Sequence, residues 1–465
     1  MHDSDLKPAS LELSTIQPIP ADQRHGRPRD LFTIWFGSNI MVLTVVTGAL
    51  AVTVFKMPFL SAMLALVLGN LIGGVFMALH SAQGPQLGVP QMVQTRGQFG
   101  SFGSLLVVGL VVIMYLGFFA SNLVLGGQSL HSRFPVFSSN GAIVLVGVIS
   151  VIATIFGYRL IHAYTRVMAY ASGAVLLLAF VWIMAVHGLP QDFLSRGEFS
   201  MARFLGTLSV AALWQLAYAP YVSDYSRYMP ADTGARPAFW ASYWGCCLGS
   251  ILPMTLGVLV GLSVEGNVID GLVSMTGSIS ALVVVVFATG IAATNAMNLY
   301  CGTLSTITVG QTLIPTWAAG ASARAITALV LFGISLALAL LGQDDFMVNY
   351  TNFILLLLYV LVPWTAINLV DYYLVAHGQY DVASFFRRDG GIYGYFNWTA
   401  VSCYVLGVLV QVPFMATELY TGVAARALGG ADISWLVGLA VISPLYWWAS
   451  KRRASRITSI MQGSV

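Results

Sequence analysis

Long runs without charge constrain this chain more than any other feature. Residues 278–310 read SISALVVVVFATGIAATNAMNLYCGTLSTITVG and contain no Asp, Glu, Lys, Arg or His. Only 8% of the 465 residues are charged, whereas a soluble globular protein is typically about a quarter charged. Because about 20 apolar residues span a bilayer as a helix, the composition predicts an all-α integral membrane protein. A barrel of alternating strands is excluded because the apolar runs are continuous.

The boundaries of these runs predict twelve transmembrane helices in one domain, 31–450. The runs lie between Pro, Gly or charged residues, at 31–52, 58–79, 101–127, 141–157, 167–187, 204–222, 238–263, 278–304, 324–342, 349–370, 395–415 and 433–450. An even number of spans puts both ends of the chain on one side of the membrane. We expect residues 1–30, which are polar and rich in proline, to form a disordered tail, and residues 451–465 to form a second tail.

The distribution of basic residues predicts which side the tails occupy. Of the 21 Lys and Arg residues, 16 fall on the side of the two ends and five on the other. The positive-inside rule therefore predicts that both ends lie in the cytoplasm. We expect a multi-pass protein of the inner (plasma) membrane.

Two predicted helices are interrupted by polar or helix-breaking residues. The first contains Gly37, Ser38 and Asn39, and the sixth contains Gln215 and then Pro220. Glycine weakens a helix, proline removes a backbone donor, and Ser and Asn can bond a loosened backbone. Ordinary kinks would explain either break alone. Breaks at corresponding places in two halves are typical of transporters that bind their substrate near the middle of the membrane.

Carboxamides occur where lipid or apolar protein is expected. Asn295 and Asn298 differ by about 60° around their helix and so face nearly one direction. Asn122 shares a face with Phe118, four residues earlier. Such amides either bond a neighbouring helix or offer donors and acceptors to a planar, neutral heterocycle. Nearby aromatic residues, among them Tyr218, could stack on such a ring.

The predicted helix centres contain no Asp, Glu, Lys or Arg, which argues against a carboxylate proton relay. Carbonyls of the first break at Ser38, together with Thr289, could hold a cation, although Thr289 can equally bond its own helix. The four cysteines lie in apolar runs and the seven histidines are scattered. We therefore predict no metal site, no cofactor and no catalytic residues, and expect the protein not to be an enzyme. We expect no nucleic-acid partner and no obligate protein partner.

The chain resembles the nucleobase:cation symporter-1 family, in its purine–cytosine permease branch. The resemblance runs from about residue 24 to residue 450 and rests on several patterns in order. These are WFGSNIMVLTVVTG, LGNLIGG, VPQMVQTRGQFG, GFFASNLVLGGQ, YVSDYSRYMP, NAMNLYCGTLS, TNFILLLLYVLVPWTAINLVDYYLV and GGIYGYFNW.

This resemblance implies a LeuT-like fold with inverted repeats over 31–187 and 204–370 and two peripheral helices over 395–450. It implies import of a nucleobase, cytosine or a purine, or a related small N-heterocycle, by symport with Na⁺ or H⁺. The alternative is a symporter of the same fold for an amino acid, another small amine or a vitamin precursor. The family often has Trp at the two aromatic positions that are Phe118 and Tyr218 here. The substrate-binding residues so implied or predicted are Ser38, Asn39, Phe118, Asn122, Gln215, Tyr218, Asn295, Asn298 and Asn352.

Overall fold

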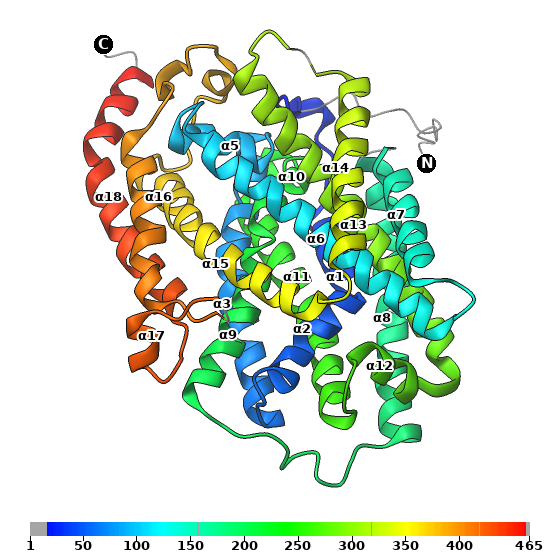
Figure 1. Ribbon diagram of the computed structural model, residues 1–465. Helices are drawn as coiled ribbons and strands as arrows, with labels where there is room; N and C mark the ends of the chain where they lie inside the picture. Colours follow the sequence, from blue (N-terminus) through cyan, green and yellow to red (C-terminus); the bar gives the residue numbers. More distant parts are fainter. Residues whose placement is uncertain (1–15, 156–157, 318, 418, 462–465) are drawn as a thin grey trace.

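The computed structural model describes residues 16–155, 158–317, 319–417 and 419–461. Within these ranges the chain forms helices and loops, and its extended pairing is limited to one antiparallel bridge between Ala416 and Thr421. The long helices run side by side in one bundle (Figure 1). The part of the prediction that calls the protein all-helical is therefore confirmed.

The first predicted helix is two helices with a sharp bend. Pro28–Asn39 (α1) and Val42–Thr53 (α2) meet at 62°. The break follows the predicted Gly-Ser-Asn stretch and falls at Ile40 and Met41. Polar side chains stabilise it: the Asn39 Nδ2 atom donates to the Trp35 carbonyl at 2.7 Å, and the Thr44 hydroxyl donates to the Asn39 carbonyl at 2.5 Å. The Asn39 carbonyl lies at the end of α1, where the helix supplies no N–H for it, and the Thr44 hydroxyl satisfies it.

The sixth predicted helix is also divided. Met201–Leu216 (α9) and Ala219–Ser226 (α10) are separated by a turn at Ala217 and Tyr218. Pro220 lies in the first turn of α10, where its missing N–H has no helical partner to lose. Proline therefore begins the second piece instead of kinking a continuous helix.

Most of the remaining helices follow the predicted runs, and four short helices lie between those runs, at 84–87, 91–99, 268–276 and 423–427. Their bounds are Phe59–Ser81 (α3), Gly84–Leu87 (α4), Gln91–Phe99 (α5), Ser104–Arg133 (α6), Ser139–Ile155 (α7), Tyr158–Trp182 (α8), Ala235–Ser263 (α11), Val268–Thr276 (α12), Ser280–Leu313 (α13), Ala321–Gly342 (α14), Phe346–Val370 (α15), Trp398–Gln411 (α16), Val423–Ala427 (α17) and Ser434–Met461 (α18). Short 3₁₀ or π turns occur at Ala21–Gln23 (η1), Ile183–His187 (η2), Ala231–Thr233 (η3), Gly277–Ile279 (η4), Asp371–Val375 (η5), Val382–Phe386 (η6), Gly391–Tyr393 (η7) and Val412–Phe414 (η8).

By length and composition, seven helices in the described residues could each cross a membrane, and the bent pair α1–α2 makes an eighth. The divided pair α9–α10, the shorter apolar helices α7 and α16, and α18 are not among these spans, so twelve spans remain a prediction. Burial separates the inner from the outer helices. In the most apolar stretch of α15, 83% of residues are buried inside the protein, against 22% in α14. Helix α14 therefore turns most of its surface outward, and α15 belongs to the core.

Glycines let α2 and α11 pack closely at the broken helix. A Cβ atom at Gly48 would lie 2.2 Å from the Met254 carbonyl oxygen, and one at Gly257 would lie 1.9 Å from the Val45 carbonyl oxygen. Neither position accepts a larger residue unless the two backbones separate, which is typical of helix contacts in membranes.

The two predicted tails are partly folded. Backbone hydrogen bonds from Ile19 to Gly88 at 3.0 Å and from Gly26 to Tyr228 at 2.9 Å hold the first segment against the bundle. The prediction of disorder therefore fails for residues 16–30, and residues 1–15 lie outside the described residues. At the other end, α18 continues through Met461, so 451–461 is helix and 462–465 is not described. The segment η1 and the end of α18 lie at the same end of the molecule (Figure 1).

Candidate functional site

A pocket of about 280 Å³ lies where the two helix breaks meet α6 and α13. Residues of both breaks line it, and no charged residue does. The lining residues are Met41, Phe118, Asn122, Trp214, Ala217, Tyr218, Tyr221, Thr294 and Asn298. Four of the predicted site residues are therefore brought together: Phe118, Asn122, Tyr218 and Asn298.

Three asparagines form a hydrogen-bonded group beside this pocket. The Asn295 Oδ1 atom accepts from Asn122 Nδ2 at 2.9 Å and from Asn298 Nδ2 at 3.2 Å. The Asn295 Nδ2 atom donates to the Phe119 carbonyl at 3.3 Å. Asn295 does not line the pocket, so it fixes the orientation of the two amides that do. The Asn122 Oδ1 atom is buried and has no hydrogen-bond partner among the described residues, which leaves an acceptor for a ligand.

Tyr221 is a pocket residue that the sequence prediction missed. Its hydroxyl donates to Asn298 Oδ1 at 2.5 Å and so joins α10 to α13 across the pocket. Its ring packs against Tyr115, with centroids 4.5 Å apart. The available signal was its spacing, because it follows Tyr218 by three residues and shares a helix face with it.

Aromatic rings enclose the pocket from several sides. Phe118 makes edge contacts with Trp214 and with Phe353, at centroid distances of 6.3 and 5.3 Å. Tyr218 makes edge contacts with Trp35 and Trp214 at 5.7 and 6.0 Å. Edge-to-face packing of this kind holds the rings in defined orientations, so that a flat ligand meets rigid apolar walls.

Asn39 and Gln215 lie behind the pocket and connect the broken helices to their neighbours. The Asn39 Oδ1 atom accepts from Trp214 Nε1 at 2.8 Å and from the Ser250 hydroxyl at 3.0 Å. The Gln215 Nε2 atom donates to Asn70 Oδ1 at 2.7 Å. Neither residue lines the pocket. In this structure both amides bond neighbouring helices beside the breaks, and their predicted contact with substrate stays a prediction.

Two other predicted site residues also stay outside the pocket lining. The Ser38 hydroxyl donates to the Trp35 carbonyl of its own helix at 3.3 Å. Asn352 precedes Phe353, which contacts Phe118, and its Oδ1 atom is buried without a hydrogen-bond partner among the described residues. Asn352 is therefore next in sequence to a residue that contacts the pocket wall, but it does not itself line the pocket.

Oxygen atoms converge between the first break and α13. The Thr294 hydroxyl donates to the Ser38 carbonyl at 2.7 Å. At Gly290, a Cβ atom would lie 3.0 Å from the Ile40 carbonyl oxygen and 3.6 Å from the Ser172 hydroxyl, which is buried without a described partner. These are neutral oxygen ligands of the kind that hard cations bind. The predicted Thr289 is directed elsewhere, since its hydroxyl donates to the Val285 and Val286 carbonyls of its own helix at 2.9 and 2.8 Å.

Charged residues are buried near the end of α10, beyond the predicted end of that helix. Asp224 and Arg227 are 1% and 0% exposed. The Asp224 Oδ1 atom accepts from the backbone N–H of Gln91, the first residue of α5, at 2.8 Å, and so caps the start of that helix. The described residues contain no group of three or more His, Cys, Asp or Glu that could hold a metal ion.

A multi-pass helical membrane protein whose central pocket lies at two helix breaks has the design of a secondary transporter. Comparison with known proteins identifies the family within this class. Residues 18–438 match the family described as permease for cytosine/purines, uracil, thiamine, allantoin. The chain belongs to this family.

Named relatives cover nearly the whole chain. A putative purine-cytosine permease of Bacillus subtilis, YxlA, is 41% identical over 96% of this chain and 97% of its own length. The purine-cytosine permease fcyB of Emericella nidulans is 25% identical over 93% of this chain and 86% of its own length.

The fold is that of a solved nucleobase-cation-symport-1 family transporter. The structure of Mhp1 in a closed conformation with bromovinylhydantoin bound matches with a TM-score of 0.76 at 18% identity, over 97% of each chain. An inward-facing structure of Mhp1 matches with a TM-score of 0.71 at 19% identity, over 95% of this chain and 96% of that one. At this identity the likeness shows the fold alone.

Proposed function

We propose that this protein imports a nucleobase, cytosine or a purine, or a related small N-heterocycle, by cation symport across the inner membrane. The observation that carries the proposal is the uncharged central pocket, in which aromatic walls face the two amides held by Asn295. A neutral planar ring with donors and acceptors on its edge matches both features. The names of the relatives support this substrate class.

Within the pocket, we assign the edge of the ring to Asn122 and Asn298 and its faces to Phe118 and Tyr218. The free Asn122 Oδ1 atom accepts from a ring N–H, while Asn298 exchanges its bond with Tyr221 for one to the ligand. No covalent step occurs. Binding lowers the free energy of the closed arrangement because the ligand contacts both breaks at once, and population of the two access states shifts accordingly.

The coupling cation, Na⁺ or H⁺, is proposed to act at the first break. For Na⁺, the ligands are the Ser38 and Ile40 carbonyls with the Thr294 and Ser172 hydroxyls. A cation there stabilises the bent form of α1–α2, which also positions Met41 in the pocket wall. Ion and substrate therefore favour the same conformation, which is the physical basis of coupling.

Uptake of labelled cytosine, adenine, guanine, uracil and allantoin in cells without their own permeases tests the substrate class. We expect saturable uptake of at least one ring and competition among similar rings. Uptake of none of them, together with saturable uptake of an amino acid or amine, would replace the proposal by the alternative. Repeating the assay with and without Na⁺, at fixed pH and membrane potential, identifies the ion.

A further inference from the structure

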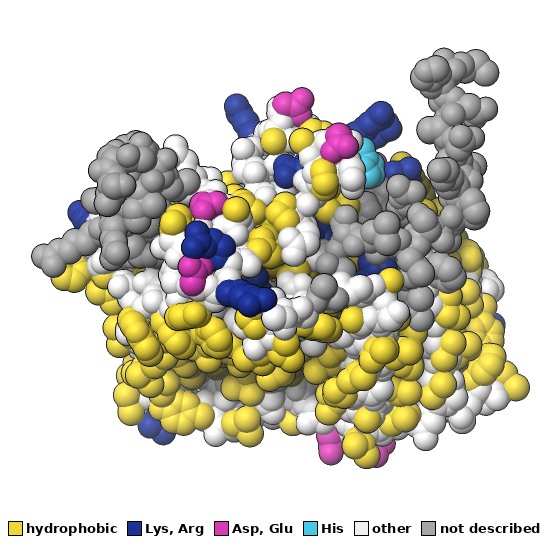
Figure 2. All heavy atoms as spheres, turned by 90° about the horizontal axis from the view of Figure 1, so that it is seen from above, with side chains coloured by type: hydrophobic (Ala, Val, Ile, Leu, Met, Phe, Trp, Pro, Cys, Tyr) yellow, Lys and Arg dark blue, Asp and Glu magenta, His cyan; other side chains and the backbone are white. Residues whose placement is uncertain are grey.

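A second pocket, of about 700 Å³, lies at the end of the molecule that carries η1 and the end of α18. Figure 2 views this end, where Lys and Arg side chains are scattered over the surface. The lining contains three arginines, Arg96, Arg387 and Arg388, and no Asp or Glu. It shares no residue with the central pocket. The positive-inside rule accounts for basic residues at this end but not for their convergence on one hollow.

Arg96 is a buried cation surrounded by neutral acceptors. It is 4% exposed and donates to the Phe385 and Thr308 carbonyls and to the Thr312 hydroxyl, each at 2.9 Å. Its Nε atom has no hydrogen-bond partner among the described residues. Burial lowers the pKa of Arg96 to about 10, so the guanidinium remains protonated at neutral pH. Its charge therefore adds to the field in the pocket without a carboxylate to balance it.

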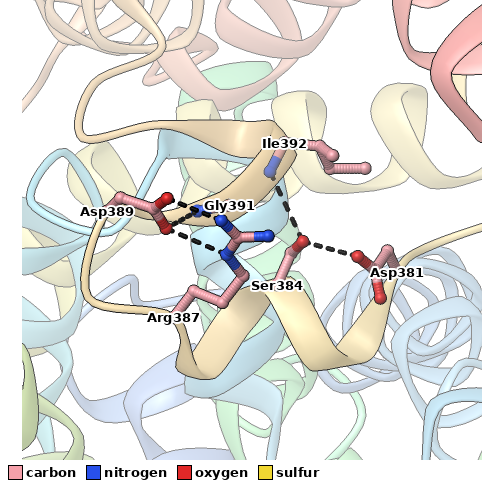
Figure 3. Close-up of polar contacts among 6 residues, drawn as sticks. All are labelled: Asp381, Ser384, Arg387, Asp389, Gly391 and Ile392. Carbon is pink, nitrogen blue, oxygen red and sulfur yellow. Dashed lines mark hydrogen bonds and ion pairs between the residues drawn. The ribbon is translucent and has the colours of Figure 1, made fainter.

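The loop that supplies the other two arginines is held in shape by its own polar contacts (Figure 3). Arg387 pairs with Asp389 through two hydrogen bonds of 3.0 and 2.7 Å, and Asp389 also accepts from the Gly391 N–H at 2.9 Å. The hydrogen bond from Arg387 lowers the pKa of Asp389 to about 2, so this pair stays ionised and neutral overall. Ser384 donates to Asp381 at 2.5 Å. The wall is thus preformed, and Arg388 beside it is exposed.

We propose that this pocket binds a phosphate-bearing anion. Guanidinium groups favour phosphate because their planar N–H donors match its oxygens and its charge. Hydroxyl and amide groups in the lining provide further donors: Ser101, Thr316, Gln17 and Gln311. The bound group would join α5, the end of α13 and the loop 381–392. This site is separate from the proposed transport activity and does not depend on it. The phosphate comes either from a soluble metabolite or from an anionic lipid headgroup.

Binding to the purified full-length protein in nanodiscs tests the proposal. Equilibrium dialysis with labelled inorganic phosphate, at constant ionic strength set with chloride, measures the soluble source. Native mass spectrometry of protein taken from nanodiscs of phosphatidylcholine with phosphatidylglycerol measures retained anionic lipid. The test variant is Arg388→Glu, which leaves the buried Arg96 and the Arg387–Asp389 pair intact. The control is Arg236→Glu, a change of an exposed arginine at the start of α11, outside the pocket.

We expect the wild type and the Arg236→Glu variant to bind one of the two probes, and Arg388→Glu to bind it roughly tenfold or more weakly. Saturable phosphate binding assigns a soluble source, and retained phosphatidylglycerol without phosphate binding assigns a lipid. If neither probe distinguishes Arg388→Glu from the control, or neither binds the wild type, the site is refuted. Uptake of the heterocycle is measured in parallel. Failure of the anion site with normal uptake leaves the proposed function in place.

Discussion

Asn295 shows how one buried side chain sets the chemistry of its neighbours. Its single carbonyl oxygen accepts from Asn122 and from Asn298, which directs the NH₂ groups of both side chains to Asn295. The Asn122 oxygen then points away from this contact and is left for a ligand. Because a buried acceptor without a partner is destabilising, a ligand N–H at this position is strongly favoured. Asn295 therefore positions the binding groups without touching the pocket.

Replacing Asn122 or Asn298 by alanine is expected to weaken transport. Each change removes a hydrogen-bonding group from the pocket lining, and loss of such a bond costs about 1–2 kcal/mol, or roughly a tenfold rise in KM. The measurement is uptake kinetics of the transported ring at matched surface expression. Asn349→Ala is the control, because Asn349 is exposed and is not among the residues that line the pocket. Wild-type kinetics in both pocket variants would exclude these amides from the site.

The two threonines of α13 distinguish the proposed cation site from the one predicted by sequence. Thr294→Val removes the hydroxyl that bonds the Ser38 carbonyl, so for Na⁺ coupling we expect a roughly tenfold higher Na⁺ concentration at half-maximal uptake. Thr289→Val removes a hydroxyl that bonds its own helix, and we expect no such shift. The measurement is uptake as a function of Na⁺. A larger effect from Thr289→Val would return the site to the sequence prediction.

At the scale of elements, the bent pair α1–α2 depends on its contact with α11. Gly257→Ala would place a methyl group 1.9 Å from the Val45 carbonyl oxygen, and relief of that overlap separates the two helices. We expect a loss of about 1–3 kcal/mol in stability, seen as a lower unfolding temperature in detergent. Gly333→Ala is the matched control, because Gly333 is also within a helix and has no atom within 4 Å of its added methyl group. Equal melting temperatures for the two variants would contradict the close packing.

Sequence patterns located the broken elements because helix-breaking residues act locally. Gly37 and Pro220 each stand within a few residues of an observed break. The exact break positions depend on partners far along the chain, such as Trp214, which bonds Asn39. For the same reason, the sequence did not indicate that Asn39 and Gln215 bond neighbouring helices. A single sequence shows that an amide is buried, but not which helix supplies its partner.

The terminal segments show the same limit. Residues 16–30 are polar and contain proline, which is typical of disorder. Arg24 nevertheless donates to the Ile19 carbonyl at 2.9 Å and to the Pro85 carbonyl at 2.8 Å. These contacts order a segment whose composition alone gives it little apolar surface to bury. Long-range contacts of this kind are invisible to local composition.

At the scale of the whole molecule, substrate and cation are proposed to act on the same break. Met41 lines the central pocket, while the Ser38 and Ile40 carbonyls face the oxygens of α13 and α8. A change in the α1–α2 bend therefore alters both sites at once. The Tyr221–Asn298 bond links the other break to α13, so both divided helices are tied to one continuous helix. This arrangement allows two ligands to be coupled without contacting each other.

Orientation in the membrane is a property of the whole molecule, and it can be tested with two single substitutions. Ser195 lies in the loop 188–200, and Ala383 lies in the loop 381–392. The second loop lines the basic pocket, which is the pocket that contains Arg96, Arg387 and Arg388. Both are exposed, and Figure 1 shows loop 188–200 at the end opposite η1. The four native cysteines are buried, so background labelling is low.

A membrane-impermeant maleimide applied to intact cells should label Ser195→Cys and not Ala383→Cys, because the positive-inside rule places the arginine-rich end in the cytoplasm. Both should react after the membrane is opened, which controls for reactivity. Labelling of Ala383→Cys alone in intact cells would mean that the protein has the opposite orientation, and that the basic pocket faces outward.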